Sequence, residues 1–286
     1  MTTEQVYGLL AAVDGSQTSL DGALWAATES VHNNRSLTVC HVIDTRPMID
    51  LPMPPDLVAE LDKRADQVLD RAIVRIHAGH PRLGVGRLTL HGEPAQELTA
   101  ASGQAELTVL GSRGSSRFAA LLLGSVSAQV TAHANTPVVV VHPTGHRSGP
   151  VLIGVDGSDR SVHALGWGFD YASRHRVGVQ ALHVFADPMG TPSLGLPPNV
   201  DHGRTRQAAE RYLADEVARW TDKYPAVPVD EIACGGSAAR ALVDASRGAS
   251  LLVVGHRGHG GFTGLLLGSV SQVVLRHAQC PVAIIR

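Results

Sequence analysis

Residues 106–125 read ELTVLGSRGSSRFAALLLGS, and residues 250–269 read SLLVVGHRGHGGFTGLLLGS. Each stretch begins with an apolar run of strand character and continues into a loop with the glycine spacing Gly-x2-Gly-x9-Gly-Ser. Between residues 111–130 and 255–274, 12 of 20 positions are identical. Because the same loop occurs twice with the same internal spacing, the chain is predicted to contain an internal duplication.

Landmarks outside this loop also occur twice, first at an offset of 142 residues and later at an offset of 144. A repeat of this length is a whole domain and is too long for one unit of a solenoid. The sequence therefore predicts two domains, residues 1–143 and 150–286, joined by a polar, turn-forming segment. The repeated pairs are Val13-Asp14-Gly15-Ser16 and Val155-Asp156-Gly157-Ser158, Trp25 and Trp167, His41-Val42 and His183-Val184, Gly111 and Gly255, Gly124-Ser125 and Gly268-Ser269, and Pro137 and Pro281.

Each half alternates apolar strand patterns with helical patterns. This alternation requires crossover connections, which predicts an α/β fold with a mostly parallel sheet and helices on both faces. Such an open sheet binds ligands beyond the carboxyl ends of its strands, where the strand order reverses. In the first half, the expected strands are 6–13, 36–43, 85–91, 106–110 and 136–141, and the expected helices are 17–32, 56–78, 94–102 and 124–134, with the same order repeated from Val151 to Ile285.

The composition excludes several classes of protein. With 44% apolar residues over 286 positions, the chain can bury a core, so it is not a wholly disordered protein. A formal net charge of −2 provides no general attraction to nucleic acid or to an anionic membrane. No apolar run approaches the roughly 20 residues of a membrane helix. Three cysteines without paired spacing, and an N-terminus without a signal-peptide pattern, favour a cytoplasmic location.

The repeated glycine loop is the strongest candidate site. Small residues allow backbone to approach a bulky anion closely, and the amides at a helix N-terminus attract phosphate. The loop lacks the lysine of a P-loop, so the nearby cations are Arg113, Arg117 and Arg257. Two alternatives remain open: the glycines only end strands and begin helices, and the arginines are solvated surface residues.

Two strand ends extend the candidate site. Asp14 and Asp156 follow the first strand of each half, where a carboxylate can accept hydrogen bonds from ribose hydroxyls. Capping of the following helix is the alternative role for these aspartates. The backbone at Val42 and Val184 ends the second strand and could contact an adenine edge. The histidine before each valine is expected to be buried and bonded to backbone.

Together, the Gly-x2-Gly-x9-Gly-Ser loop, the Val-Asp-Gly-Ser turn and the His-Val strand end resemble the universal stress protein family. The resemblance covers nearly the whole chain, in two consecutive copies, as in the tandem-domain form common in actinobacteria. It implies two flavodoxin-like or Rossmann-like domains, each with a five-stranded parallel sheet of strand order 3-2-1-4-5 and helices on both faces.

The resemblance to the ATP-binding branch of this family also implies a ligand. ATP, with any Mg²⁺ carried on its phosphates, would bind once in each domain. The glycines, serine and arginine would contact phosphates, the aspartate the ribose, and the valine backbone the adenine. The implied residues are Asp14, Val42, Gly111, Arg113, Gly114, Gly124 and Ser125 in the first half and Asp156, Val184, Gly255, Arg257, Gly258, Gly268 and Ser269 in the second.

The leading functional hypothesis is an ATP-binding stress-response regulator that acts through conformation or through an unidentified protein partner. A slow ATP hydrolase or phosphate-transfer protein is one alternative, although no nucleophile motif or general base at a γ-phosphate is recognisable. A protein-interaction scaffold with structural glycines is another. A dinucleotide oxidoreductase is disfavoured because Gly-x-Gly-x-x-Gly does not follow the first strand. Zinc is disfavoured because no cysteine lies near the paired histidines.

Two further features concern association and access. The β-branched last strands, 136–141 and 280–285, are expected at sheet edges, which are normally paired or protected. We therefore expect them to pair, between the halves or between chains, and expect a homo-oligomer. The Pro-rich segments 44–58 and 186–203 are long enough to be flaps over the sites or variable surface excursions.

Overall fold

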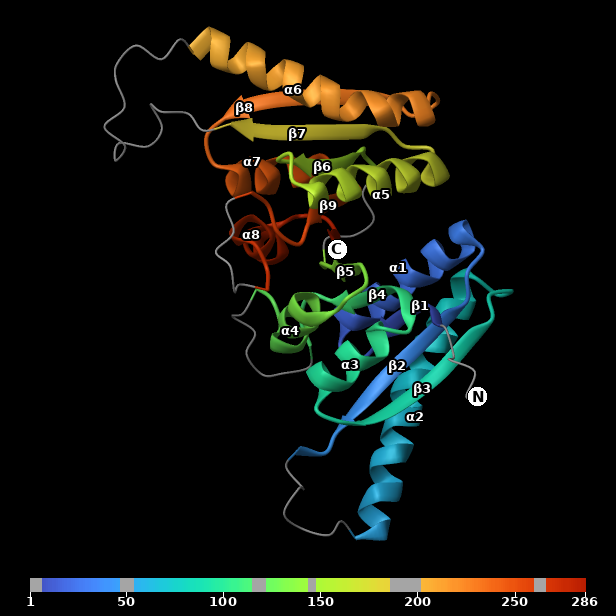
Figure 1. Cartoon of the computed structure of the whole chain (residues 1–286). Helices are drawn as coiled ribbons and strands as arrows, with labels where there is room; N and C mark the ends of the chain where they lie inside the picture. The colour runs from blue at the N-terminus through green and yellow to red at the C-terminus, as the bar shows by residue number, and fades with distance from the viewer. Residues whose placement is uncertain (1–6, 47–53, 115–121, 144–147, 186–201, 260–265) are drawn as a thin grey trace, which may run out of the picture. The chain divides into compact units, whose positions relative to one another are not determined.

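The computed structural model describes residues 7–46, 54–114, 122–143, 148–185, 202–259 and 266–286. The chain divides into two compact units, Met1–Pro143 and Thr144–Arg286. Figure 1 shows that each unit has its own strands and its own helices.

The first unit alternates strands and helices as the apolar patterns predict. The expectation of a Pro-rich excursion over residues 44–58 is wrong at both of its ends, because Asp44 belongs to a strand and residues 55–58 to a helix. Proline suits the first turn of a helix, where its missing N–H has no partner to lose. Residues 47–53 lie outside the described residues. The elements are β1 (Tyr7–Ala12), α1 (Gln17–Asn33), β2 (Leu37–Asp44), α2 (Pro55–Gly79), β3 (Val85–Gly92), α3 (Pro94–Ser102), β4 (Ala105–Gly111), α4 (Ser125–His133) and β5 (Val138–Val141).

The second unit repeats this order of elements. Most of its Pro-rich segment, residues 186–201, lies outside the described residues, and its last residues begin a helix. The elements are β6 (Val151–Val155), α5 (Asp159–His175), β7 (Val179–Phe185), α6 (His202–Lys223), β8 (Val229–Gly235), α7 (Ala238–Ala245), the short 3-10 turn η2 (Ser246–Gly248), β9 (Leu251–Gly255), α8 (Ser269–His277) and β10 (Val282–Ile285).

Both units form parallel sheets with the same strand order. The order is β3-β2-β1-β4-β5 in the first unit and β8-β7-β6-β9-β10 in the second, which confirms the expected order 3-2-1-4-5 for each. Leu9 in β1 pairs with Leu37 in β2 and with Leu107 in β4. The strand order therefore reverses beside β1 and beside β6, where an open α/β sheet leaves room for a ligand.

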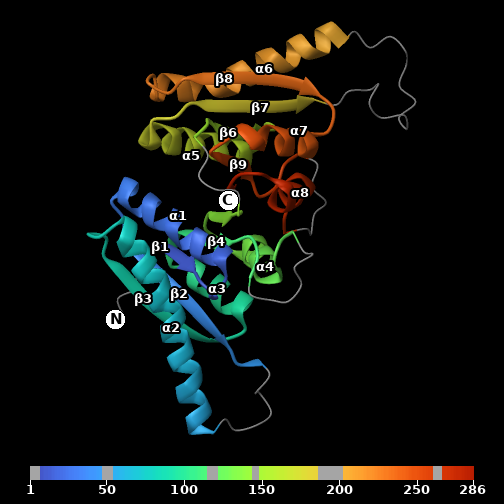
Figure 2. The same cartoon turned by 180° about the vertical axis from the view of Figure 1, so that it is seen from behind.

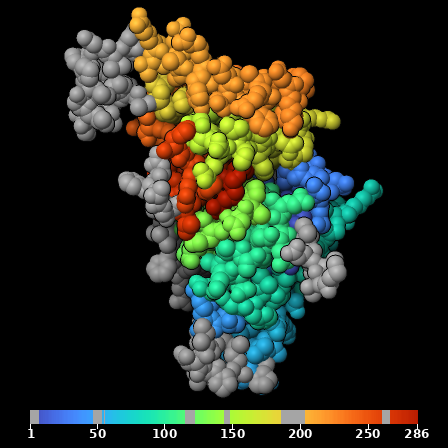
Figure 3. All heavy atoms as spheres, in the orientation of Figure 1, coloured from blue at the N-terminus to red at the C-terminus, as the bar shows by residue number. Residues whose placement is uncertain are grey.

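Helices cover both faces of each sheet. In the first unit α1 and α2 pack together on one face and α3 and α4 on the other, as Figures 1 and 2 show from opposite sides. In the second unit the pairs are α5 with α6 and α7 with α8. Figure 3 shows atoms of α6 and β8, in orange, at the surface of this unit. Among the described residues, no helix is long and apolar enough to cross a membrane.

The helices that follow the first strands begin and end by the same local rules. Ser16 and Ser158 are the N-caps of α1 and α5, and each side chain accepts a hydrogen bond from the amide three residues later. Both helices end at a residue in the left-handed conformation, Asn34 with φ 50° and Arg176 with φ 55°. The duplicated sequence thus specifies the same helix length twice.

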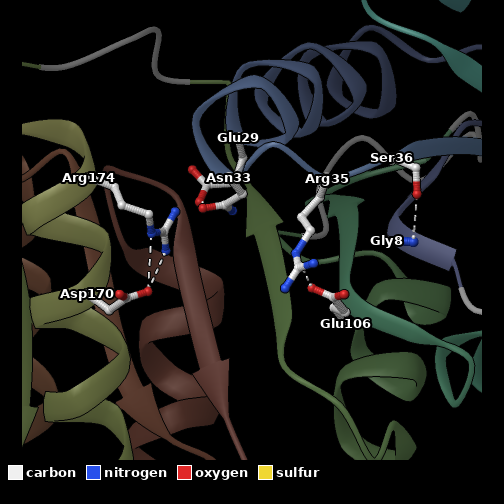
Figure 4. Close-up of polar contacts among 8 residues, drawn as sticks. All are labelled: Gly8, Glu29, Asn33, Arg35, Ser36, Glu106, Asp170 and Arg174. Carbon is white, nitrogen blue, oxygen red and sulfur yellow. Dashed lines mark hydrogen bonds and ion pairs between the residues drawn. The ribbon is translucent and has the colours of Figure 1, made fainter.

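Figure 4 shows how α1 returns into β2 in the first unit. Arg35 Nε lies 3.0 Å from Glu106 Oε2 of β4, and the Gly8 amide donates to Ser36 Oγ at 3.2 Å. A Cβ on Gly8 would lie 2.5 Å from the Ser36 carbonyl oxygen, so this close approach of β1 requires glycine. These contacts hold the amino ends of β1, β2 and β4 together.

The cores of the two units use different side chains at equivalent positions. In the second unit, Phe169 of α5 is fully buried and stacks on Trp220 of α6 and on Tyr224, which directly follows α6, with ring centroids 6.4 and 6.1 Å apart. In the first unit, Ala27 and Ile76, both also fully buried, stand at the positions of Phe169 and Trp220, and His80 stands at that of Tyr224. The contact between the two long helices is therefore aromatic in one unit and aliphatic in the other.

Candidate functional site

Each unit has a cleft at the carboxyl ends of its central strands. The first cleft has a volume of about 380 Å³ and the second about 210 Å³. All fourteen residues singled out from the sequence line these clefts, seven in each. They are Asp14, Val42, Gly111, Arg113, Gly114, Gly124 and Ser125 in the first and Asp156, Val184, Gly255, Arg257, Gly258, Gly268 and Ser269 in the second.

The aspartate after β1 lies directly against the glycine loop after β4. Asp14 Oδ1 accepts a hydrogen bond from the Ser16 amide at 3.0 Å, across the tight turn in which Gly15 has φ +86°. A Cβ on Gly114 would lie 2.7 Å from Asp14 Oδ2, so glycine permits this approach. Two segments 100 residues apart in the sequence thus meet at one edge of the cleft.

In the second unit the equivalent carboxylate is Asp156, whose two oxygens accept hydrogen bonds from two segments. Asp156 Oδ1 accepts from the amide and the hydroxyl of Ser158, at 3.0 and 2.7 Å, and Oδ2 accepts from the His259 amide at 3.3 Å. A Cβ on Gly258 would overlap Asp156 Oδ2. The carboxylate therefore links the turn after β6 to the loop after β9. The alternative role of the aspartates, capping of the following helix, is wrong, because Ser16 and Ser158 are the N-caps of α1 and α5. Their role in ligand contact stays a prediction.

The third glycine of each loop begins a helix that no side chain caps. The Gly124 amide donates to Ser112 O at 2.7 Å, and Gly124 is the N-cap of α4. Gly268 takes the same place before α8, with its amide 2.8 Å from His256 O. The first amides of these helices have no intrahelical acceptor. Since the first residues of α4 and α8 line the clefts, these amides are available to an anion there.

Contacts within the protein explain the first glycine of the loop but not the third. A Cβ on Gly111 would lie 2.6 Å from the Ser19 amide nitrogen, so helix α1 packs against this position. Packing of the helix after the first strand thus accounts for the first glycine. A Cβ on Gly124 or Gly268 would have its nearest neighbours at 3.5 and 3.4 Å, which is ordinary contact. Contacts with the described residues therefore do not require glycine at these two positions.

The second strands contribute the apolar end of each cleft. Val42 and Val184 line it, together with Leu98 of α3 in the first unit and Leu242 of α7 in the second. The preceding histidines bind backbone, as expected: His41 Nδ1 donates to Val13 O at 2.7 Å. His183 Nδ1 does the same to Val155 O at 2.8 Å. Both rings are half-buried rather than fully buried.

The arginine of each loop lines its cleft, and its surroundings differ between the units. In the first unit, the carbonyl of Arg113 accepts from the hydroxyl of Thr18. In the second, Arg160 occupies the position equivalent to Thr18, and its Nε donates to His256 Nε2 at 3.1 Å. His256 Nδ1 also lies 3.2 Å from Ile285 O, so both ring nitrogens are engaged within the protein. Arg117 lies outside the described residues.

Sequence reasoning missed Tyr212 of α6. A Cβ on Gly157 would overlap its hydroxyl, and its ring centroid lies 5.0 Å from that of His183. The pKa of Tyr212 is raised, first by burial and then by the charges of Glu216 and Asp156. The first unit has Val68 at the equivalent position. The repeat alignment alone shows this difference, but it does not show that the side chain reaches the turn after the first strand.

The comparisons with known proteins agree with the duplicated fold. The model of the universal stress protein family matches residues 9–142 and 148–286. Universal stress protein Rv2005c of Mycobacterium tuberculosis is 37% identical over 290 residues, which cover 98% of this chain and 97% of that protein. Universal stress protein Rv2623 of the same organism is 34% identical over 291 residues, with 98% and 96% covered.

A solved structure supports the fold in addition. A universal stress protein from Archaeoglobus fulgidus superposes with a TM-score of 0.71 at 21% identity, covering 100% of this chain and 99% of that one. At this identity the likeness concerns the fold alone. Since the family model matches both units and the mycobacterial relatives align along almost the whole chain, the chain belongs to the universal stress protein family.

Proposed function

We propose that the chain is an ATP-binding regulatory protein with one adenine-nucleotide site in each unit. The observation that carries the proposal is the convergence of separate segments on one cleft. The turn after the first strand, the end of the second strand, the glycine loop and an uncapped helix N-terminus all line it, twice. Each cleft is lined by both polar and apolar side chains, which suits a nucleotide.

The described residues fit the parts of ATP. The phosphates would lie at the first amides of α4 and α8, beside Ser125 and Ser269, where positive helix ends attract anions. The ribose would lie near Asp14 and Asp156. The adenine would pack at the apolar end. Among the described residues no group of three or more His, Cys, Asp or Glu is arranged to hold a metal ion, so Mg²⁺ would be held mainly by the phosphates.

The proposed role is binding rather than efficient catalysis. The described lining of both clefts contains no lysine, and its carboxylates are engaged within the protein: Asp14 and Asp156 accept hydrogen bonds, and Asp44 pairs with Arg46. We propose that nucleotide binding stabilises each unit and changes an interaction with a cytoplasmic partner.

We also propose a homo-oligomer formed through the last strands. Light scattering of the purified chain tests it by measuring the mass in solution.

The nucleotide sites are tested with Gly124→Ala and Gly268→Ala, alone and together. The new methyl group has ordinary contacts within the protein, so the fold tolerates it, but it occupies the space proposed for phosphate. We expect each substitution to weaken ATP binding at its own site by about tenfold, equal to about 1.4 kcal/mol. Isothermal titration calorimetry on the full chain measures both sites.

Matched controls are Gly84→Ala and Gly248→Ala, one in each unit. Both glycines are exposed, and a Cβ on either meets no atom of the described residues within 4 Å. We expect the parent's ATP affinity in both controls. ATP binding by the double variant equal to that of the parent would contradict the site assignment. No ATP binding by the parent at millimolar nucleotide would contradict the proposed function as a whole.

A further inference from the structure

We infer that the two nucleotide sites differ in ligand preference, and that the second selects for highly charged phosphate chains. Its affinity for ATP relative to AMP should exceed that of the first site. This inference rests on the proposed function, because it concerns the same two clefts. It depends on residues that the glycine motif does not include.

The difference lies in three equivalent positions at and beside the start of the glycine loop, of which only Arg113 and Arg257 line the clefts. Arg257 of the second unit has an arginine counterpart, Arg113, in the first. The two neighbouring positions are neutral and small in the first unit but basic in the second. They are Thr18 and Ser112 in the first unit and Arg160 and His256 in the second.

Contacts within the second unit hold this basic cluster at the start of the glycine loop. Arg160 lies in the first turn of α5, and a Cβ on Gly255 would lie 2.9 Å from its Cβ. Its Nε donates to His256 Nε2 at 3.1 Å. Arg257 lines the cleft, and its Nε is buried without a hydrogen-bond partner among the described residues. A buried N–H donor without an acceptor is costly, so an anion in the cleft that accepted from Arg257 Nε would stabilise it.

The directions of two pKa shifts near the second glycine loop agree with an excess of positive charge there. The pKa of His256 is lowered, first by burial and then by the guanidinium groups of Arg286, Arg160 and Arg257, against an opposing hydrogen bond to Ile285. The pKa of Arg286 is also lowered, first by burial and then by Arg257. The neighbouring guanidinium groups disfavour the charged form of His256, and a bound polyanion would offset their positive charge.

Nearby carboxylates do not remove the difference between the units. Asp156 has its counterpart in Asp14, so this charge is the same in both clefts. Asp159 replaces Gln17 but is exposed, and water screens exposed charges strongly. Arg46 also lines the first cleft, but its guanidinium group is paired there with Asp44 and Glu93. The second cleft is the smaller, about 210 Å³ against about 380 Å³. ATP carries more negative charge than AMP, so the added cations favour ATP.

The experiment measures each site separately in the full chain. Asp14→Ala with Gly124→Ala weakens the first site and leaves the second to report, and Asp156→Ala with Gly268→Ala does the reverse. ATP and AMP are titrated into both chains by calorimetry at low salt. We expect the ratio of ATP affinity to AMP affinity to be about tenfold higher at the second site, because one added cation lies near the phosphates.

A matched pair of substitutions identifies the residue responsible. In the chain that reports on the second site, Arg160→Gln should lower the ratio toward that of the first site, whereas Arg160→Lys should keep it, because only the charge differs between the two variants. Equal ratios at both sites, with ATP still bound, would overturn this inference and leave the proposed function standing. Equal ratios in Arg160→Gln and Arg160→Lys would overturn the role of Arg160. Absence of nucleotide binding at both sites would overturn both.

Discussion

The two units place the same backbone elements around their clefts but surround them with different side chains. Ser127 Oγ donates to Gly111 O at 2.7 Å, and Ser271 Oγ donates to Gly255 O at 2.8 Å. These hydrogen bonds tie the helix after the loop to the preceding strand in the same way twice. The first cleft has a volume of about 380 Å³ and the second about 210 Å³. The charged side chains near the two clefts also differ. Residues that shape the backbone are therefore shared, and residues that set volume and charge have diverged.

The largest expected effect is the loss of stability when the aromatic contact in the core of the second unit is removed. Phe169→Ala removes a fully buried ring that stacks on Trp220 of α6 and on Tyr224 just beyond its end. We expect it to lower the free energy of unfolding of the second unit by about 3–5 kcal/mol, because the surrounding structure cannot fill the cavity. Urea unfolding followed by tryptophan fluorescence and circular dichroism measures this loss.

The matched control for this variant is Val74→Ala, at a side chain that is 67% exposed. We expect a change of less than about 0.5 kcal/mol there. A Phe169→Ala chain that unfolds at the same urea concentration as Val74→Ala would show that the aromatic contact contributes little to the stability of the second unit.

The next prediction concerns the glycines that pack against the helix after the first strand of each unit, Gly111 and Gly255, in contrast to Gly124 and Gly268, which are proposed to contact the ligand. Gly111→Ala places a methyl group 2.6 Å from the backbone nitrogen of Ser19, and Gly255→Ala places one 2.9 Å from the side-chain Cβ of Arg160. We expect both to destabilise their units by about 1–3 kcal/mol, with the larger loss at Gly111, because it meets more backbone. Thermal unfolding without nucleotide, beside the exposed control Gly84→Ala, measures the losses. Stability equal to that control would contradict the packing explanation.

The smallest effect concerns pH and exists only in the second unit. Because the pKa of His256 is lowered in the folded chain, the unfolded chain binds the proton first as the pH falls. The contribution to stability is complete above the ordinary histidine pKa of about 6.5 and is lost as the pH falls through the lower folded pKa. His256→Ser introduces the residue found at position 112.

This variant should therefore lose less stability on acidification than the parent. Melting temperatures at about pH 7.5 and about pH 5.5, on either side of the ordinary histidine pKa, give the comparison. The same decrease in both chains would show that His256 does not cause the acid sensitivity.

Most of the fold was predictable because each element carries a local signal. The helix expected over residues 94–102 has these bounds in the structure, since proline begins it and its apolar spacing is regular. The strand expected over 136–141 begins two residues later, at Val138, because strand ends depend on pairing with β4. Strand order followed from family resemblance, since apolar patterns do not show which strands are neighbours.

The candidate site was predictable to the extent that its residues belong to the repeat. All the glycines, aspartates and valines chosen from the sequence line the clefts. The packing role of Gly111 was not predictable, because Ser19 lies far away in the sequence. The positions of Tyr212 and Arg160 were also not predictable. Nothing in their own segments indicates that Tyr212 reaches the turn after β6 or that Arg160 reaches the glycine loop after β9.

The sequence by itself determined the duplication, the alternation of strands and helices, and the chemical type of residue at each strand end. These properties are local, or they repeat at a fixed offset, so they can be recognised without coordinates. The tertiary structure decided which glycines are needed for packing, how large each cleft is and which cations gather at the second one. Those properties depend on side chains from distant segments meeting in space, and only the folded chain brings them together.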